Sequence, residues 1–160
     1  MAELRIGVLT CSDTRKEAQD TAGRALADLI VERGWTVEAY EVCPDECGTI
    51  EAAIVAMAEA GVDVVLTCGG TGLGPRDVTP EATLAVCDRQ VPGIAEHMRA
   101  ESLKVTGRAM LSRATAAARG RTLVVNLPGS EKAARECFGF VADQFEHAVE
   151  MMHGGGHQPR

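Results

Sequence analysis

Short apolar runs alternate with helical patterns along the first half of the chain, and this alternation constrains the fold more than any other feature. Nearly continuous apolar runs at 4–10 (LRIGVLT) and 62–68 (VDVVLTC) are typical of strands buried on both faces, whereas 36–42 (TVEAYEV) alternates like an edge strand. Because parallel strands are joined by helical crossovers, the pattern predicts a mainly parallel sheet with helices on both faces.

The helices between these runs carry their own start and stop signals. Asp20 or Thr21 can cap a first helix that stops at Gly34, and Thr49 begins a second that ends at Gly61. In the second half of the chain, we expect a helix that begins with Thr79 as N-cap and Pro80, and helical patterns from Pro92 to about Leu111. These are followed by a hairpin of 114–119 and 121–127 and by a last helix capped by Ser130. The predicted fold class is therefore α/β, a three-layer αβα sandwich whose mostly parallel sheet has one antiparallel strand.

Length and composition predict one domain. The 160 residues, 46% of them hydrophobic, suit a single core, which we place at 1–152. The end of the chain, 153–160, is expected to be a flexible tail rather than a metal site formed by its two His residues.

Charge and cysteine content narrow the class of function. A net charge of −7 argues against a nucleic-acid partner, and no apolar run approaches the roughly 20 residues of a membrane span. The first residues do not resemble a signal peptide, so we expect a cytoplasmic protein. The six cysteines form no C-x-x-C pair and are expected to be free, buried thiols; a pairing or metal site of Cys43 and Cys47 is the less favoured alternative.

The segment that follows the third strand is rich in glycine. Gly69, Gly70, Thr71 and Gly72 come directly after a buried strand, where backbone N–H groups can converge on an anion. Pro75 stands where a Walker A loop needs its Lys and where a dinucleotide fingerprint needs its third Gly, so the segment belongs to neither class. We interpret it as a phosphate-binding turn; a purely structural tight turn is the alternative.

Two acidic residues are predicted to lie beside this turn. Ligands bind beyond the carboxyl ends of parallel strands, and both Asp45 and Asp77 fall in loops at that edge. Such a pair is suited to holding Mg²⁺ against phosphates in phosphoryl or nucleotidyl transfer. The alternative for Asp77 is that it caps the following helix or pairs with Arg76.

Further polar loops fall at the same edge. Asn126-Leu127-Pro128-Gly129-Ser130 closes the last strand and caps the last helix, which is either a simple strand-to-helix turn or a second anion or pterin contact. Ser112 and Arg113 add a hydroxyl and a cation.

The order of these motifs resembles one known family. The run from Thr67 to Thr83 (TCGGTGLGPRDVTPEAT) resembles the signature of the MogA/MoaB-type molybdenum cofactor biosynthesis proteins, whose fold also occurs in the G domains of gephyrin and plant Cnx proteins. The family's other marks appear in order: Ser12-Asp13, Asp20-Thr21-Ala22-Gly23, Pro44-Asp45-Glu46, Pro92-Gly93-Ile94, Leu111-Ser112-Arg113 and Asn126 to Ser130. Only Cys11 and Thr14, which flank the intact Ser12-Asp13, depart from the commoner residues.

The resemblance implies a molybdopterin adenylyltransferase, in which molybdopterin and ATP are substrates, Mg²⁺ is the cofactor, and adenylyl-molybdopterin and pyrophosphate are the products. It assigns catalysis and metal binding to Asp77 and Asp45. It assigns substrate and nucleotide binding to Ser12, Asp13, Gly69, Gly70, Thr71, Gly72, Thr79, Pro80, Glu81, Ser112, Arg113, Asn126, Pro128, Gly129 and Ser130. A catalytically idle molybdopterin carrier of the same fold is the alternative, whereas a molybdate-inserting enzyme usually has extra domains, for which this chain is too short.

The resemblance also implies a homo-oligomer, either a trimer or a dimer of trimers, that hands its product to a molybdate-inserting enzyme. Ile94, Met98 and Met110 are apolar residues that we expect to support such assembly.

Overall fold

The protein forms one six-stranded sheet between two layers of helices. A computed structural model describes residues 3–155 of the chain. The sheet has the order β2-β1-β3-β6-β5-β4, and its strands are β1 (Arg5–Cys11), β2 (Thr36–Cys43), β3 (Val64–Cys68), β4 (Arg89–Gln90), β5 (Ala116–Arg119) and β6 (Thr122–Leu127). β1, β2, β3 and β6 pair in parallel. Because β5 is antiparallel to both β6 and β4, it is the single reversed strand, as the sequence predicts.

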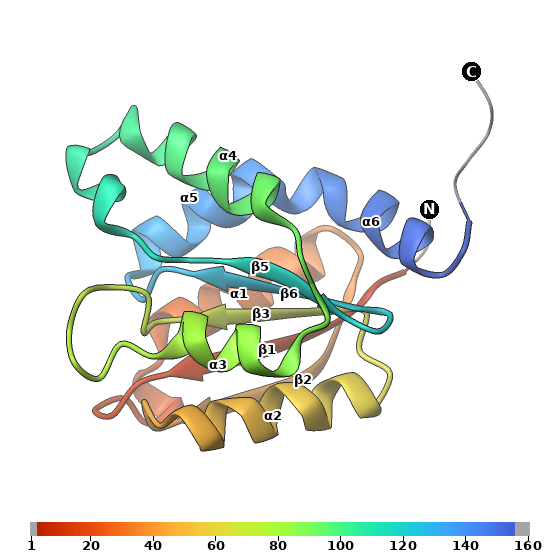
Figure 1. Cartoon of the computed structure of the whole chain (residues 1–160), viewed down its shortest axis with the longest axis horizontal. Helices are drawn as coiled ribbons and strands as arrows, with labels where there is room; N and C mark the ends of the chain where they lie inside the picture. The colour runs from red at the N-terminus through yellow and green to blue at the C-terminus, as the bar shows by residue number, and fades with distance from the viewer. Residues whose placement is uncertain (1–2, 156–160) are drawn as a thin grey trace.

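The helices cover both faces of the sheet. They are α1 (Thr21–Glu32), α2 (Cys47–Glu59), α3 (Thr79–Val86), α4 (Pro92–Leu103), α5 (Glu131–Val141) and α6 (Phe145–Met152). In Figure 1, α2 and α3 lie below the sheet, and α1, α4, α5 and α6 lie on its other side. This confirms the three-layer αβα sandwich.

The two core clusters follow from the alternation of side chains along the buried strands. Ile6 and Val8 of β1 pack toward α1 and α5, whereas Leu9 and Cys11 pack toward α2. β3 is buried at every position, as its continuous apolar run predicts. Within residues 3–155, no helix is both long enough and apolar enough to cross a bilayer.

Several expected boundaries differ from the structure. α2 begins at Cys47 rather than Thr49, and the two-residue strand β4 was not predicted. The helical pattern expected from Pro92 to Leu111 is broken after Leu103, and the chain continues as a separate 3-10 turn, Gly107–Leu111. A glycine at position 107 weakens helix continuation there.

The last helix is also divided. A 3-10 turn, Ala142–Gln144, separates α5 from α6. The break brings Phe138 and Phe145 to the same indole, with ring centroids 6.4 and 6.1 Å from that of Trp35. Tertiary packing of aromatic rings therefore overrides a periodicity that continues through the turn.

Thr79 is not the N-cap of α3. Val78 occupies that position, and Thr79 is the first helical residue, with its backbone N–H donating to Gly70 O at 3.2 Å. Its side chain is fully buried against the glycine turn, so it cannot reach the free amides of the helix. The expected tail, 153–160, lies outside the described residues from 156 onward; Met152 ends α6, and His153 follows it.

Candidate functional site

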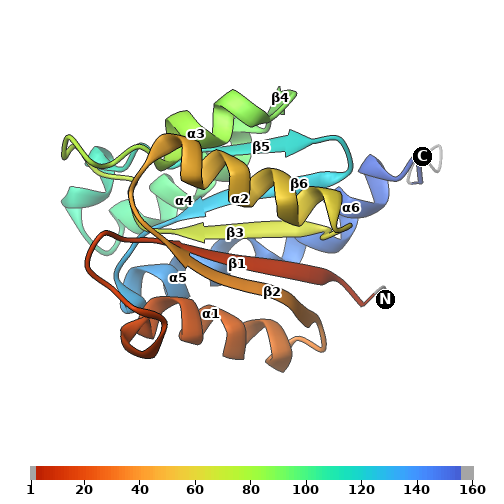
Figure 2. The same cartoon turned by 90° about the horizontal axis from the view of Figure 1, so that it is seen from below.

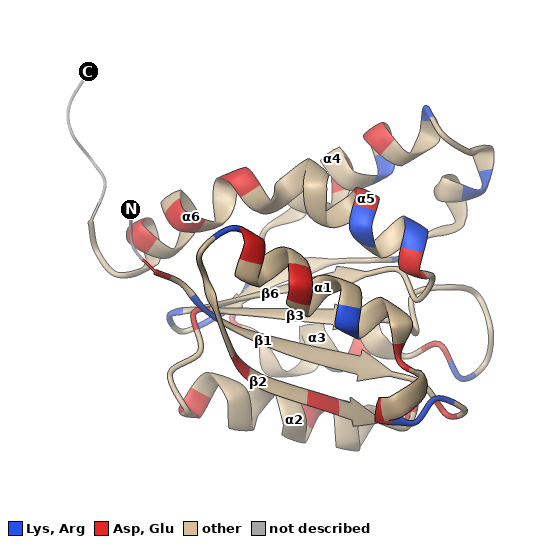
Figure 3. Cartoon of the chain, turned by 180° about the vertical axis from the view of Figure 1, so that it is seen from behind, with Lys and Arg blue, Asp and Glu red and all other residues tan. Residues whose placement is uncertain are grey.

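The polar loops predicted from the sequence gather at one edge of the sheet. The registers that end β1, β2, β3 and β6 place Cys11 beside Cys43, Thr10 beside Cys68, and Cys68 beside Leu127. The loops that follow these four strands therefore start at the same level, at the end where Figure 2 shows the arrowheads of β3 and β6. Figure 3 shows acidic and basic positions close together on these loops.

The glycine turn has a backbone that only glycine adopts readily. Gly69 and Gly70 have φ values of +97° and +69°. A Cβ on Gly69 would lie 2.4 Å from the carbonyl oxygen of Cys11, and one on Gly70 would lie 2.2 Å from Thr79 Oγ1. The turn is thus pressed against β1 and the start of α3, and a side chain at either position would displace it.

One of the four predicted backbone donors is already used. The Gly69 N–H donates to Leu127 O at 3.1 Å, which ties the turn to the end of β6. The amide of Gly69 therefore holds the turn in place, and the N–H groups of Gly70, Thr71 and Gly72 remain as the candidate donors of this segment.

Arg113 fixes the outer part of the glycine loop. Its Nε donates to Gly72 O at 2.7 Å, its Nη2 donates to Asp77 O at 2.6 Å, and its Nη1 bonds to the Glu81 carboxylate. Its own backbone N–H donates to Thr71 O at 2.9 Å. The Arg113 guanidinium also holds the pKa of Glu81 below its ordinary value. Both residues, predicted as ligand contacts, therefore act on the loop rather than presenting free groups to a ligand.

Asp45 presents an unpartnered oxygen to the glycine turn. Its Oδ1 is buried without a hydrogen-bond partner among the described residues, and so is Thr79 Oγ1. Both atoms face the same spot, because a Cβ on Gly70 would meet them at 3.2 and 2.2 Å. A buried carboxylate oxygen without a hydrogen-bond partner destabilises the fold unless a ligand, ion or water molecule binds to it. These two oxygens therefore mark a polar position beneath the turn to which such a group can bind.

Asp77 lies on the glycine-rich loop between β3 and α3. Its Oδ2 accepts from the Gly74 N–H at 2.9 Å. Burial raises the pKa of Asp45, and the negative charges of Asp13 and Asp77 add to that increase. The structure thus places both predicted acids against the glycine loop, with Asp45 beside Gly70 and Asp77 beside Gly72 and Gly74.

These acids fit a magnesium ion that is shared with a substrate. Among the described residues, no three His, Cys, Asp or Glu side chains converge as a complete metal-ligand set. Mg²⁺ does not require one, because it is usually held by one or two carboxylates, substrate phosphates and waters. The unpartnered Oδ1 of Asp45 and the carboxylate of Asp77 match that donor set.

Asp13 joins the loops after β1 and β2. Its N–H donates to Asp45 Oδ2 at 3.1 Å, and its Oδ1 accepts from the Asp45 N–H at 2.9 Å. Ser12 Oγ accepts from the N–H groups of Thr14 and Arg15, at 3.3 and 3.1 Å, so this hydroxyl shapes its own loop. Ser12 and Asp13 therefore support the position of Asp45.

Asn126 lies beneath the site rather than in it. It is fully buried, and its Nδ2 donates to Thr67 Oγ1 at 3.0 Å and to Thr83 Oγ1 at 2.9 Å. Its Oδ1 accepts from the Thr115 N–H at 3.2 Å. The side chain thus links β6 to β3, to α3 and to the start of β5, so its hydrogen-bonding groups are used within the fold.

The remaining predicted residues divide between the surface and the interior. Ser130 is exposed and caps α5, where its Oγ accepts from the Ala133 N–H at 3.2 Å. Gly129 O accepts from Arg15 Nη1 at 2.7 Å, which ties this loop to the one after β1. Ser112 is half-buried and its Oγ accepts from the Ala114 N–H, whereas Pro80 is buried in the first turn of α3.

A cavity of about 290 Å³ opens beside the glycine turn. Four of the residues predicted from the sequence border it: Thr71, Gly72, Ser112 and Pro128. The rest of its wall is mainly apolar and comes from α4, α5 and the 3-10 turn between α4 and β5, including Met98, Leu111 and Cys137. The sequence motifs do not reveal these wall residues, because they lie on helices whose apolar pattern is the ordinary signature of a core.

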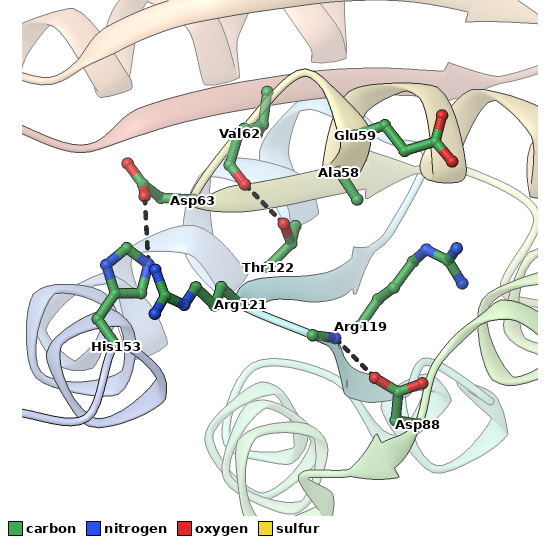
Figure 4. A pocket seen from close by; sticks show the side chains of 11 residues that line it. Ala58, Glu59, Val62, Asp63, Asp88, Arg119, Arg121, Thr122 and His153 are labelled. Atoms are coloured by element: carbon green, nitrogen blue, oxygen red, sulfur yellow. Dashed lines mark hydrogen bonds and ion pairs between the residues drawn. The ribbon is translucent and has the colours of Figure 1, made fainter.

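A larger cavity, of about 580 Å³, lies at the opposite edge of the sheet (Figure 4). None of the predicted site residues lines it. Three of its polar groups have partners in the wall of the cavity: Asp88 accepts from the Gly120 N–H, Thr122 donates to Val62 O, and His153 lies 3.9 Å from Asp63. The cavity contains neither the glycine turn nor the two acids that the sequence predicts to be functional.

The chain matches one known protein family over most of its length. A family model described as a probable molybdopterin binding domain matches residues 7–147. The chain belongs to this family. The matched region includes every site residue that the sequence predicts, from Ser12 to Ser130.

Individual members of the molybdopterin-binding family are similar over most of their length. A molybdopterin adenylyltransferase of Helicobacter pylori is 38% identical over 159 residues, which cover 96% of this chain and 90% of that protein. A molybdenum cofactor biosynthesis protein B of Bacillus anthracis is 42% identical over 136 residues, which cover 83% of this chain and 80% of that protein.

Solved structures of the family share the fold. The molybdopterin biosynthesis enzyme MoaB of Thermus thermophilus is 46% identical, with a TM-score of 0.88 and coverage of 97% of this chain and 99% of that one. The molybdopterin biosynthesis Mog protein of Mycobacterium ulcerans is 34% identical, with a TM-score of 0.87 and coverage of 96% and 99%.

Proposed function

We propose that this chain is a molybdopterin adenylyltransferase that uses Mg²⁺ and ATP. The observation that carries the proposal is the pair Asp45 and Asp77 beside the glycine turn, with Asp45 Oδ1 buried and unpartnered. The relative from Helicobacter pylori, named for this activity, supports it.

The reaction needs alignment and charge neutralisation more than covalent help from the protein. The molybdopterin phosphate attacks the α-phosphorus of ATP, a P–O bond forms, and the bond to the β-phosphate oxygen breaks to release pyrophosphate. The N–H groups of Gly70, Thr71 and Gly72 orient the phosphates, because a fixed backbone donor costs no reorganisation when charge develops. Asp45 and Asp77 would hold Mg²⁺, which when bound would supply positive charge to the phosphates of the nucleotide.

The cavity beside the turn is the proposed pterin site. Its volume of about 290 Å³ is near the lower limit for ligand pockets, which suits the ring system of the substrate rather than the whole molecule. Ser112 and Pro128 border it on the side of the glycine loop, and Ser130 with the first amides of α5 lies beyond Pro128. A phosphate attached to the pterin would thus be directed toward the turn and the amides of α5.

The decisive assay measures pyrophosphate release with ATP, molybdopterin and Mg²⁺ together and with each omitted. We expect release only from the complete mixture. Asp77→Ala is expected to lower kcat at least about 100-fold, because a lost metal ligand forfeits several kcal/mol of charge stabilisation. Asp88→Asn, which removes a carboxylate at the opposite edge of the sheet, is the matched control and should retain activity.

Two outcomes would contradict this assignment. Turnover of Asp77→Ala within about threefold of wild type would show that Asp77 does not hold a catalytic metal ion, since a threefold change in rate corresponds to less than about 1 kcal/mol of activation free energy. Tight pterin binding without ATP affinity or pyrophosphate release, measured by calorimetry, would show instead the catalytically idle carrier.

We further propose a homo-oligomer, trimer or dimer of trimers, in the cytoplasm, which hands its product to a molybdate-inserting enzyme. Met110 is 68% exposed and Leu111 is 54% exposed, so both are available for assembly, whereas Met98 is buried in the core and is not. All six cysteines are free, which suits a reducing compartment. Light scattering distinguishes the two assemblies.

A further inference from the structure

Arg76 reaches from the glycine loop across to the loop after β1. Its Nε donates to Asp13 Oδ2 and its Nη2 to Asp13 Oδ1, each at 3.0 Å. Glu46, on the loop after β2, lies 4.0 Å from the same guanidinium. Arg76 directly precedes Asp77, and its partner Asp13 is hydrogen-bonded to Asp45, so the ion pair lies beside both acids.

Three other arginines near the glycine loop are engaged with the backbone. Arg113 donates to Gly72 O and Asp77 O. Arg15 donates to Gly129 O, and Arg99 donates to Ser112 O and Ala114 O. These contacts hold loops together and would be lost if a guanidinium turned toward a ligand.

Arg76 differs because its partners are exposed carboxylates. Its side chain is 58% exposed, compared with 34% for Arg113, and the Asp13 side chain is 35% exposed. An exposed ion pair is worth about 0–1 kcal/mol, so an anion of higher charge can replace the carboxylate at little cost. Phosphate oxygens accept two parallel N–H bonds from a guanidinium as a carboxylate does, but with more negative charge.

The acids near Arg76 carry charge of the same sign as a nucleotide. They are Asp13, Asp45, Glu46 and Asp77, and they repel a nucleoside triphosphate that approaches them. Mg²⁺ offsets part of this repulsion. The guanidinium of Arg76 lies among the same acids and carries the balancing charge that is not committed to the backbone.

We propose that Arg76 binds the β- and γ-phosphates of ATP and that Asp13 holds its guanidinium in position until the nucleotide arrives. The proposal rests on the adenylyltransferase function. Asp13 Oδ1 also accepts from the Asp45 N–H at 2.9 Å, so the loop that carries Asp45 stays tied to Asp13 when Arg76 leaves. The exchange therefore frees a cation without loosening the proposed metal site.

The test compares four variants of the full chain: Arg76→Ala, Arg76→Lys, Asp13→Asn and Arg121→Ala. Arg121→Ala is the matched control, because it removes an exposed arginine that lines the cavity at the opposite edge. For each variant, the KM for ATP, the inhibition constant of pyrophosphate and the dissociation constant of molybdopterin are measured, with thermal unfolding as a check on the fold.

Arg76→Ala should raise the KM for ATP and the inhibition constant of pyrophosphate about 10- to 100-fold, the range for charge-assisted hydrogen bonds. Its affinity for molybdopterin should change less than about twofold, because Arg76 does not line the cavity proposed for the pterin. Arg76→Lys should recover part of the loss, since it keeps the charge but not the two-pronged geometry. Asp13→Asn should lower the KM for ATP about two- to fivefold, because the competing carboxylate charge is removed.

Each contrary result has a definite meaning. An Arg76→Ala enzyme with wild-type constants for ATP and pyrophosphate overturns this inference alone, and equal losses of ATP and pterin affinity show a structural role instead. A KM of Asp13→Asn at or above wild type overturns the restraint by Asp13. A wild-type chain that neither binds ATP nor releases pyrophosphate overturns the proposed function together with this inference.

Discussion

Replacing Asn126 by Ala tests whether this residue supports the site or contacts the substrate. The substitution removes three hydrogen bonds in a fully buried position, to Thr67, Thr83 and the Thr115 N–H. Each bond is worth about 1 kcal/mol net, and leaving the Thr115 N–H without an acceptor adds about 1–2 kcal/mol. The expected loss in the free energy of unfolding is therefore about 4 kcal/mol, a large part of the 5–15 kcal/mol of a typical domain.

Urea unfolding followed by circular dichroism measures this loss. With an m-value of about 2 kcal/mol/M, a loss of about 4 kcal/mol moves the midpoint by about 2 M. The protein concentration is held fixed, because assembly of subunits also shifts the apparent stability. Ser130→Ala is the comparison at the same end of the sheet: it removes only an exposed N-cap bond and should cost about 1 kcal/mol.

The kinetic constants separate the two roles of Asn126. If its side chain only positions β6, β3 and α3, activity should fall in proportion to the unfolded fraction. A midpoint shift below about 0.5 M together with a KM that rises about tenfold would refute this reasoning, because the side chain would then contribute to binding and not to the fold.

Three further predictions concern the loop, the acid range and the thiols. Gly69→Ala should lower the free energy of unfolding by at least about 2 kcal/mol and abolish activity, because its Cβ would lie 2.4 Å from Cys11 O at a φ of +97°. Thermal unfolding and the pyrophosphate assay measure these effects, and a stable, active variant would contradict the prediction. The Arg113 guanidinium lowers the pKa of Glu81, so this pair stabilises the fold above the ordinary value of 4.5, and its contribution is lost as the pH falls through the lowered pKa. Glu81→Gln should therefore flatten the dependence of stability on pH below 4.5, and an unchanged slope would exclude this contribution. A thiol reagent at pH 8 should react with at most Cys47 and Cys87 in the native protein and with all six cysteines after unfolding. The other four, Cys11, Cys43, Cys68 and Cys137, are buried, and burial raises the pKa of Cys68 to about 12. Fast reaction of a third thiol would contradict this burial.

The layers and the edge that carries the site were predictable because they depend on local patterns. The continuous apolar run of β3 and the Asp20 cap of α1 are each visible within a few residues, and the structure confirms both, with Asp20 Oδ1 accepting from the Gly23 N–H at 3.0 Å. Parallel pairing then places the loops after β1, β2, β3 and β6 together, whatever the detailed packing.

Pairwise contacts between distant residues were not predictable from such patterns. The motif that contains Asn126 indicates a polar residue near the end of a strand, but its side chain direction depends on Thr67 and Thr83, which are 59 and 43 residues away. Arg76 stands next to Asp77 in the printed sequence, yet its partner Asp13 is 63 residues away. The spacing of motifs along the sequence therefore indicates which loops meet, but it does not indicate which atoms form hydrogen bonds between them.

The accuracy of the site depends on buried polar ties more than on the apolar core. β3 is buried at every position and has apolar side chains on both faces, so burial alone separates neighbouring registers less sharply than in a strand with one polar face. A shift of one residue along a strand is about 3.3 Å, enough to separate Asp45 from the glycine turn. In β3, such a shift breaks the buried contact of Thr10 Oγ1 with Cys68 Sγ and the bond from Asn126 Nδ2 to Thr67 Oγ1. Each broken tie leaves a buried polar group without a partner, so these contacts select the one register in which Asp45, Thr79 and the turn converge.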